Sequence, residues 1–474
     1  MMCKSTQWLT LMAFPDDTHP EQSAKNNGGR QWLGFAFALL AFAFPMFWFM
    51  STDLPSFIMM SNASNKVAYV MLTLFLLGAG QKAPRVYYKD RLIWLCTLLI
   101  LMLVVGYIWQ RFSVPEALYS GSSAKKYIAA FCFFVVMAYG INAAPKVSPF
   151  LLLISTGAGL IVHLSSLPAN VWMAGWQGER LDFGLIRNAN YASDIFATAL
   201  LAGACFLPRI FSLPFRVRVL ALPLLVGFIL LMIFGVIVTQ SRAVWLGLIF
   251  SVIVLLLMGG VALLTGRYVL CWKTLTKVAT IGIGILLAGS VMFYSTGGMI
   301  AQRVSGEIIN ATTIKEMQLE TVPRSSEGVR LGLWNAAREW IAERPIFGWG
   351  GQRATRLIKQ SPYFDEKFKS NYPHLHNSYL ETLVCVGGVA FMCIIAIAFL
   401  VARRAFATWR QGTMPSDVFF FSCAFFPFWV TVNMFGSHIT NAAGFFLNAV
   451  IGGFVYSWYL RGQHNQAGLN KVEI

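Results

Sequence analysis

The sequence predicts an all-α integral membrane protein with about twelve transmembrane helices, and three observations support that prediction. Hydrophobic residues make up 57% of the 474-residue chain, charged residues make up only 12%, and the mean hydropathy is +0.61. Apolar runs long enough to cross a bilayer recur along the sequence. One long polar segment separates the ninth run from the tenth. This composition is typical of a chain that is solvated mainly by lipid.

Each predicted span is an apolar run of roughly 17 to 25 residues, the length that a helix needs to cross the hydrocarbon core. The runs lie at 32–50, 66–80, 92–110, 127–142, 149–166, 191–207, 219–239, 243–264, 278–295, 379–402, 418–434 and 442–460. Because the number of spans is even, both ends of the chain are expected on the same side of the membrane.

Positive charges in the connecting loops predict which side faces the cytoplasm. Five loops are rich in Lys and Arg and contain a single acid, Asp90; they lie at 81–91, 143–148, 208–218, 265–277 and 403–416. Cytoplasmic loops carry an excess of Lys and Arg, so we place these loops and both chain ends in the cytoplasm. The formal net charge of +17 is then mainly a topology signal, and no nucleic-acid partner is expected.

The predicted chain has five parts. They are a cytoplasmic tail at 1–31, spans one to nine at 32–295, a periplasmic helical subdomain at 296–378, spans ten to twelve at 379–460, and a cytoplasmic tail at 461–474. The exported part carries eleven Lys or Arg and eight Asp or Glu, and it is the one polar portion large enough to fold. We therefore predict a subdomain there rather than a simple loop.

An amphipathic helix is predicted within this subdomain, around 330–341. Its apolar stripe consists of Leu331, Trp334, Ala337 and Ile341, which follow helical spacing. Pro345 is expected to end the helix. The Phe347 to Gly351 stretch supplies a flexible, aromatic turn, and we expect its Trp349 to contact the substrate. The helix either braces the subdomain or forms a lid over a lipid-linked substrate.

Several arginines fall on the predicted outer face of the membrane. Arg187 precedes the sixth span, next to Tyr191, which we expect to contact the substrate. Arg242 lies in the short turn between the seventh and eighth spans. A charge at headgroup depth requires a partner or a water-filled cavity, and a bound anion is a suitable partner. Guanidinium groups bind diphosphates through paired hydrogen bonds and remain charged at every relevant pH. The alternative for each is an interfacial anchor, and Arg330 is either a ligand of the substrate or an ordinary residue near a helix start.

Two histidines close the polar segment, in the sequence Pro373-His374-Leu375-His376-Asn377-Ser378-Tyr379. Imidazole has a pKa near 6.5, so it accepts a proton from an attacking hydroxyl near neutral pH. His376 is the preferred base because Asn377 and the following helix fix it, Asn377 acting as an orienter or a helix cap. We expect His374, Asn377 and Tyr379 to contact the substrate, although His374 alone is also explained as a hydrogen-bonding residue.

No metal site is expected on the outer face. Glu179 and Asp182 are close in sequence, but they are separated by two residues and do not form an Asp-x-Asp pair. We therefore predict a metal-free reaction without a cofactor. Weaker candidates for the site are His163, Asp194 and His438, of which Asp194 is interpreted as an acid in the first turn of its helix.

Three fragments carry a resemblance to a known family. They are Arg330-x-x-x-Trp334, Glu343-Arg344-Pro345-Ile346-Phe347-Gly348-Trp349-Gly350, and His376-Asn377-Ser378-Tyr379-Leu380 followed by Gly387-Gly388. In this order, after a Ser-Arg turn and in a chain of about twelve spans, they resemble the bacterial O-antigen ligases of the O-antigen ligase and polymerase family. The similarity covers about residues 187 to 400.

This resemblance implies an inner-membrane glycosyltransferase with an architecture like that of the glycosyltransferase-C class. Such an enzyme moves O-antigen from undecaprenyl diphosphate to lipid A-core on the periplasmic face, with inversion and without a metal. Matched by position, the family's histidine corresponds to His376 and its functional arginines to Arg187, Arg242 and Arg330. The family's other acidic residue, near the end of the chain, has no clear match in the 435–441 turn.

Three other functions remain open at this stage. A polysaccharide polymerase of the same superfamily uses the same donor with a second lipid-linked glycan as acceptor. A protein O-oligosaccharyltransferase would place the glycan on a protein. A transporter with twelve spans is the non-enzymatic alternative, although the sequence shows no internal repeat and no matching pair of interrupted spans.

Overall fold

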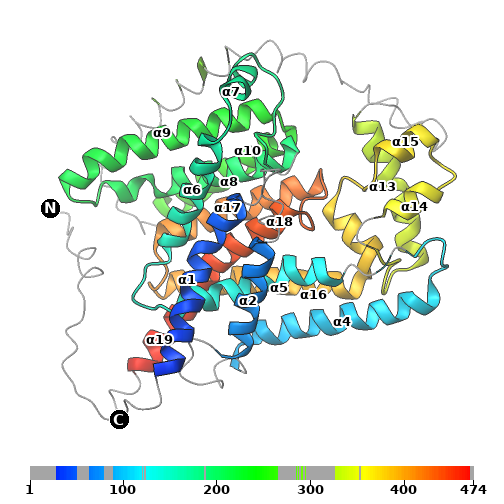
Figure 1. Cartoon of the computed structure of the whole chain (residues 1–474), viewed down its shortest axis with the longest axis horizontal. Coiled ribbons are helices and arrows are strands. Elements are labelled where there is room, and N and C mark those ends of the chain that lie inside the picture. Colours follow the sequence, from blue (N-terminus) through cyan, green and yellow to red (C-terminus); the bar gives the residue numbers. More distant parts are fainter. Residues whose placement is uncertain are drawn as a thin grey trace.

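The computed structural model describes residues 28–50, 63–78, 89–119, 121, 124–185, 188–264, 326–351 and 354–469, together with isolated positions between 284 and 294. The described elements are helices, as Figure 1 shows. They are α1 (Gly28–Met50), α2 (Ala63–Leu76), α4 (Arg91–Ser113), α5 (Ala124–Asn142), α6 (Phe150–Ser165), α7 (Ala169–Trp176), α8 (Ala189–Ile210), α9 (Phe215–Thr239), α10 (Arg242–Leu264), α13 (Ser326–Glu343), α14 (Thr355–Gln360), α15 (Glu366–Asn371), α16 (Ser378–Arg410), α17 (Ser416–Met434), α18 (Ala442–Leu447), the π-helical turn η5 (Asn448–Gly452) and α19 (Gly453–Leu469).

The membrane-spanning character of the chain is confirmed, whereas the count of twelve spans is not. Within the described residues, nine helices are long and apolar enough to cross a membrane, or up to ten if α6 and α7, which meet at 95°, form one span. The predicted run at 66–80 corresponds to α2, whose 14 residues extend only about 21 Å, less than the roughly 30 Å of a hydrocarbon core. The predicted run at 278–295 lies mostly outside the described residues.

Polar contacts at one end of the bundle involve Asp90, Arg209 and Arg404, which lie in loops that the charge pattern assigns to the cytoplasm. Arg209 forms a two-bond salt bridge with Asp417, at 2.7 and 2.8 Å. Buried Arg404 donates to Asp90 at 2.6 Å, and Asp90 also accepts from the hydroxyls of Tyr139 and Tyr456. Buried charges within a membrane protein require such partners. The contacts agree with a shared side for these loops, and the assignment of that side to the cytoplasm stays a prediction.

The polar segment contributes most of a second apolar cluster. The helices α13, α14 and α15 gather at one end of the molecule, apart from most of the membrane helices (Figure 1). Their buried side chains include Leu333, Ala337, Trp340 and Ile358, which form a cluster separate from the core of the bundle. The described part of the polar segment, residues 326–351 and 354–378, therefore packs in a second apolar cluster, which also includes Val114 after α4 and Val384 of α16.

The helix predicted at 330–341 is confirmed as α13, which ends at Glu343, shortly before Pro345. Its buried stripe is rotated from the predicted one: Leu333, Ala336 and Ala337 are fully buried, whereas Leu331 and Ile341 are only half-buried. The difference arises because two surfaces cover the helix. The buried stripe packs in the apolar cluster that α14 shares, whereas the half-buried Trp334 contacts the loop before α16.

The helix α16 is interrupted at Gly387, where the backbone has φ 77° and ψ 176°. The interruption frees carbonyl groups that an intact helix would use, and a neighbouring loop occupies them. The N–H of Trp349 donates to Val384 O at 2.8 Å and that of Gly350 donates to Cys385 O at 2.9 Å, while Gly388 N–H donates back to Pro345 O at 2.7 Å. The loop that follows α13 is thus paired directly with the unwound turn of a membrane helix.

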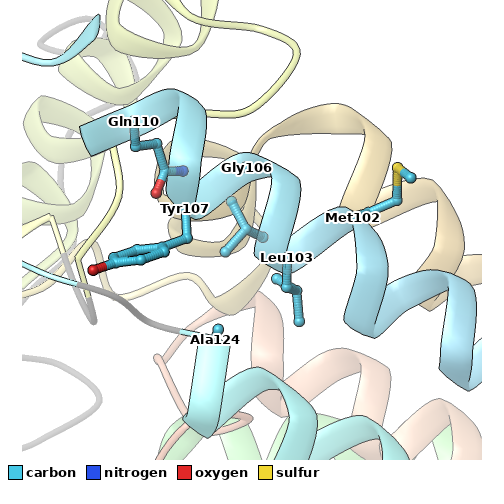
Figure 2. A pocket seen from close by; sticks show the side chains of 7 residues that line it. Met102, Leu103, Gly106, Tyr107, Gln110 and Ala124 are labelled. Carbon is cyan, nitrogen blue, oxygen red and sulfur yellow. The ribbon is translucent and has the colours of Figure 1, made fainter. Parts of the chain in front are cut away.

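Gln110 of α4 adds a further set of contacts to this junction. Its amide Nε2 donates to Cys385 O at 3.1 Å and also to Phe347 O. A small pocket opens beside it, lined by Leu103, Tyr107 and Gln110 on α4 and by Ala124 at the start of α5 (Figure 2). The polar segment is therefore connected to α4 and α16 through backbone carbonyls.

Gly387→Ala is expected to be strongly destabilising. A Cβ at this position would lie 2.2 Å from Ile346 O, and the backbone conformation, which is essentially restricted to glycine, adds its own cost of about 1–3 kcal/mol. Gly412→Ala is the matched control, because Gly412 has φ 75° and a methyl group added there would meet no atom of the described residues within 4 Å. Thermal unfolding in detergent should occur at a far lower temperature for Gly387→Ala than for Gly412→Ala. Equal, small shifts would contradict the close packing of the loop on α16.

Candidate functional site

The candidate site lies where four segments meet on the predicted outer face. These are the start of α8, the turn between α9 and α10, the loop before α16, here called the His loop (residues 372–377), and the turn between α17 and α18 (residues 435–441). Contacts connect these regions: α10 packs along α17, α17 packs along α8, and the α17–α18 turn is hydrogen-bonded to Ser378, the first residue after the His loop. The start of α16, the α17–α18 turn and α8 are therefore in contact, and Arg180 links the start of α8 to Thr239 beside the α9–α10 turn.

The His loop is fixed through Leu375, the buried residue between the two histidines. Its N–H donates to Glu381 Oε2 at 2.7 Å, and its carbonyl accepts from Trp334 Nε1 of α13 at 3.1 Å. Both backbone groups of Leu375 are thus used, one by a membrane helix and one by the polar segment. The backbone between the two histidines is therefore held in place.

The two imidazole rings lie together at the surface of the loop. Their centroids are 4.1 Å apart, and both residues are half-buried. The N–H of His376 donates to His374 Nδ1 at 3.3 Å, so a neutral His374 carries its hydrogen on Nε2. His376 has φ 51°, a left-handed conformation that is uncommon for residues other than glycine. Such backbone conformations concentrate at functional sites, where the surrounding structure enforces them.

Asn377 caps α16, as predicted. Its side-chain oxygen accepts from Tyr379 N at 3.0 Å and Leu380 N at 3.1 Å. The next residue, Ser378, joins the helix start to the α17–α18 turn: its N–H donates to Gly436 O at 3.1 Å, and its hydroxyl lies 2.6 Å from Asn433 Oδ1. The cap therefore sets the helix direction immediately after His376, and Ser378 ties it to a second loop.

Asp194 and His438 form a buried pair beside this junction. A carboxylate oxygen of Asp194 contacts His438 Nδ1, and the two side chains are 0% and 3% exposed. The ring of Tyr191 packs edge-on against the His438 ring, with centroids 5.1 Å apart. The interpretation of Asp194 as a first-turn acid is wrong, because α8 begins at Ala189 and Asp194 lies in its second turn, facing His438.

The turn that carries Arg242 is tight and well supported. Gln240 adopts φ 49° and ψ 42°, ends α9, and donates from Nε2 to Gly178 O at 2.9 Å. Arg180 donates to Thr239 O at 3.1 Å and to Asn190 Oδ1 at 2.7 Å. Arg242 is the first residue of α10 and is half-buried. A half-buried guanidinium at the start of a membrane helix is suited to an anionic ligand.

The remaining predicted residues are placed as follows. Arg187 lies outside the described residues. Arg330 is half-buried on α13, and the Tyr379 hydroxyl donates to Val430 O at 3.0 Å. Trp349 is buried, with its indole N–H donated to Trp340 O at 2.8 Å. His163 is a buried core residue with Nε2 at 2.9 Å from Phe183 O. The substrate contacts of Trp349 and Tyr379 stay predictions. In this structure the indole N–H of Trp349 and the hydroxyl hydrogen of Tyr379 are each donated to a backbone carbonyl.

Glu381 was not identified from the sequence. It is 1% exposed, and it accepts from Ala354 N, Leu375 N and the Ser437 hydroxyl at 2.7, 2.7 and 2.9 Å. One carboxylate therefore joins the polar segment, the His loop and the α17–α18 turn. Its position five residues after His376, in the first turn of a membrane helix, was the available signal, because an acid within a span is rarely without a role.

Glu381→Ala is expected to lower both stability and activity. It would leave three buried donors without an acceptor, at a cost of about 1–3 kcal/mol for each. Glu366→Ala is the matched control, since Glu366 is 90% exposed and pairs with Lys369 at 2.9 Å. Thermal unfolding should shift markedly for Glu381→Ala and hardly at all for Glu366→Ala. An unshifted Glu381→Ala variant would contradict this account of the His loop.

Comparison with known proteins identifies part of this region. Residues 227–395 match the family model described as O-antigen ligase. The matched segment begins within α9 and ends within α16, so it contains Arg242, Arg330 and both loop histidines. It does not contain α8, with Tyr191 and Asp194, or the α17–α18 turn with His438. No curated protein matches the sequence.

Proposed function

We propose, from the premise that this chain is a member of the O-antigen ligase family, that it transfers a glycan from a polyprenyl diphosphate to an acceptor hydroxyl at the outer face of the membrane. The donor is undecaprenyl-diphosphate-linked O-antigen, the acceptor is lipid A-core, and the product is complete lipopolysaccharide. The enzyme resides in the bacterial inner membrane, with its site toward the periplasm.

The observation that supports this proposal best is the joining of the His loop to the end of the bundle that carries Arg242. In the proposed reaction, His376 accepts the proton of the acceptor hydroxyl, and the hydroxyl oxygen bonds to the anomeric carbon of the donor. The bond from that carbon to the diphosphate breaks, and the diphosphate leaves with its electron pair. A direct displacement of this kind inverts the anomeric configuration.

Arg242 and Arg187 hold the diphosphate in this proposal. The half-buried position of Arg242 at the start of α10 supports its part. For Arg187 the support comes from its described neighbours: Asn190 is bonded to Arg180, which also donates to Thr239 O beside the Arg242 turn. The segment that follows Arg187 thus lies against that turn. Arginine supplies fixed positive charge for the leaving group, so the proposed reaction needs no metal ion.

The polar segment covers the site in this proposal. Trp334 of α13 donates to the loop carbonyl between the histidines, and its ring lies 6.4 Å from that of Phe435 in the α17–α18 turn. A cover of this kind limits the access of water, which would otherwise hydrolyse the donor. Both substrates are amphiphiles that diffuse in the same leaflet, so a site at the boundary of bilayer and polar segment is reached by each.

The test supplies purified protein in lipid with the diphosphate-linked glycan, and with lipid A-core as the sole added acceptor, and follows glycan mobility on a gel. Movement of the glycan to lipid A-core is the expected result. Lengthening of the donor glycan would identify a polymerase instead, and glycan on an added pilin-like protein would identify a protein O-oligosaccharyltransferase. The absence of any covalent change would favour the transporter.

A further inference from the structure

We infer that Asp194 and His438 are positioning residues for His376, acting through the α17–α18 turn. This inference rests on the proposed function, because it assigns a role in the transfer reaction. The two residues come from segments outside the part of the chain that matches the family model. They contact each other in the interior, 244 residues apart in sequence, beside the helix that follows the His loop.

Packing alone does not account for this pair. Asp194 is fully buried, and its second carboxylate oxygen has no hydrogen-bond partner among the described residues. An unsatisfied carboxylate oxygen in an apolar interior is costly, and an apolar pair of similar volume would fill the space without that cost. We therefore attribute the pair to the position in which its hydrogen bond holds His438, and not to the volume that the two side chains fill.

The ring of His438 is held in one place by its surroundings. Tyr191 packs against it edge-on, and a Cβ at Gly436 would lie 1.9 Å from His438 Nε2. The backbone of the same residue is equally confined, because a Cβ at Gly444 would lie 2.0 Å from His438 O. Because the ring packs against Tyr191 and Gly436, its bond to Asp194 ties the α17–α18 turn to α8.

The α17–α18 turn holds the first residues of α16 in place. His438 N–H donates to the Ser378 hydroxyl at 2.9 Å, and Ser378 N–H donates to Gly436 O at 3.1 Å. Ser437 donates to Glu381, the same carboxylate that accepts from Leu375 N–H between the two histidines. A continuous series of hydrogen bonds therefore runs from α8, through the turn, to the residues that flank His376.

The test compares Asp194→Leu, which removes the acceptor, with Asp194→Asn, which keeps a side-chain oxygen for His438 Nδ1–H. Thr198→Val is the matched control, since Thr198 is buried one turn further along α8 and its hydroxyl donates to the carbonyl of Asp194. For each variant, kcat is measured per donor-binding site, so that loss of folded protein does not enter, and the KM for the donor is measured alongside.

Asp194→Leu should lower kcat about a hundredfold with the donor KM changed less than about threefold, because the misplaced group is the proposed base rather than the diphosphate site. Asp194→Asn should recover most of the activity, and Thr198→Val should match the unaltered protein. Full kcat for Asp194→Leu, or equal losses for the Leu and Asn variants, would overturn the inference. Absence of transfer by the unaltered protein would instead overturn the proposed function.

Discussion

Replacing His376 by alanine is expected to reduce glycan transfer by roughly a thousandfold, within the range for removal of a general base. The variant should still bind the donor, because the proposal assigns the diphosphate to Arg242 and Arg187 and not to the His loop. Transfer is measured with purified protein and saturating acceptor, and donor binding is measured separately. Full transfer by His376→Ala would rule out its role as base.

Two further variants separate the imidazole from its surroundings. His376 has φ 51°, a conformation that asparagine adopts more readily than alanine, so His376→Asn removes the base with less change to the backbone. It should be as inactive as His376→Ala. His374→Ala should lose much less activity, since His374 accepts the N–H of His376 and supports it. The reverse order of effects would make His374 the base.

Replacing Arg242 by alanine is expected to lower transfer by roughly two to three orders of magnitude, as for the loss of a donor to a developing negative charge. The substitution removes the positive charge at the start of α10. The donor should therefore bind less tightly, and the diphosphate should leave more slowly. Arg242→Lys should recover only part of the rate, because an ammonium group lacks the paired donors of a guanidinium. The effect is measured as a higher donor KM together with a lower kcat.

Arg216→Ala is the control for Arg242, because Arg216 is an exposed arginine in the first turn of α9, at the end predicted to face the cytoplasm. It should transfer glycan at the rate of the unaltered protein. A rate for Arg242→Ala equal to that of the control would exclude Arg242 from the site, and the diphosphate would then require another cationic partner.

The features that could be predicted from the sequence are those encoded by nearby residues. Spans appear as apolar runs because each helix satisfies its own backbone in lipid, and the cap at Asn377 is recognisable because its donors are two and three residues away. The placement of Arg242 and the histidines on one side of the membrane was predicted from topology, since alternate turns between spans share a side, and it stays a prediction. These inferences needed no knowledge of how the helices pack.

The features that were missed depend on pairings between distant segments. Asp194 contacts His438 because α8 lies beside a turn 244 residues later, and the importance of Glu381 comes from Ala354, Leu375 and Ser437 meeting at one carboxylate. The interruption at Gly387 is explained by the close approach of the Ile346 carbonyl, which comes from a distant part of the sequence. The buried stripe of α13 was misplaced for the same reason, because a helix covered on two sides has two apolar faces.

One measurement tests the central claim most directly: the stoichiometry of the reaction in lipid, with chelator present, followed as both glycosylated acceptor and free undecaprenyl diphosphate. The account predicts that one diphosphate is released for each glycan transferred to lipid A-core, at a rate that the chelator leaves unchanged. Diphosphate release without a glycosylated acceptor, a requirement for metal, or no release at all would contradict a metal-free transfer carried out by Arg242 and His376.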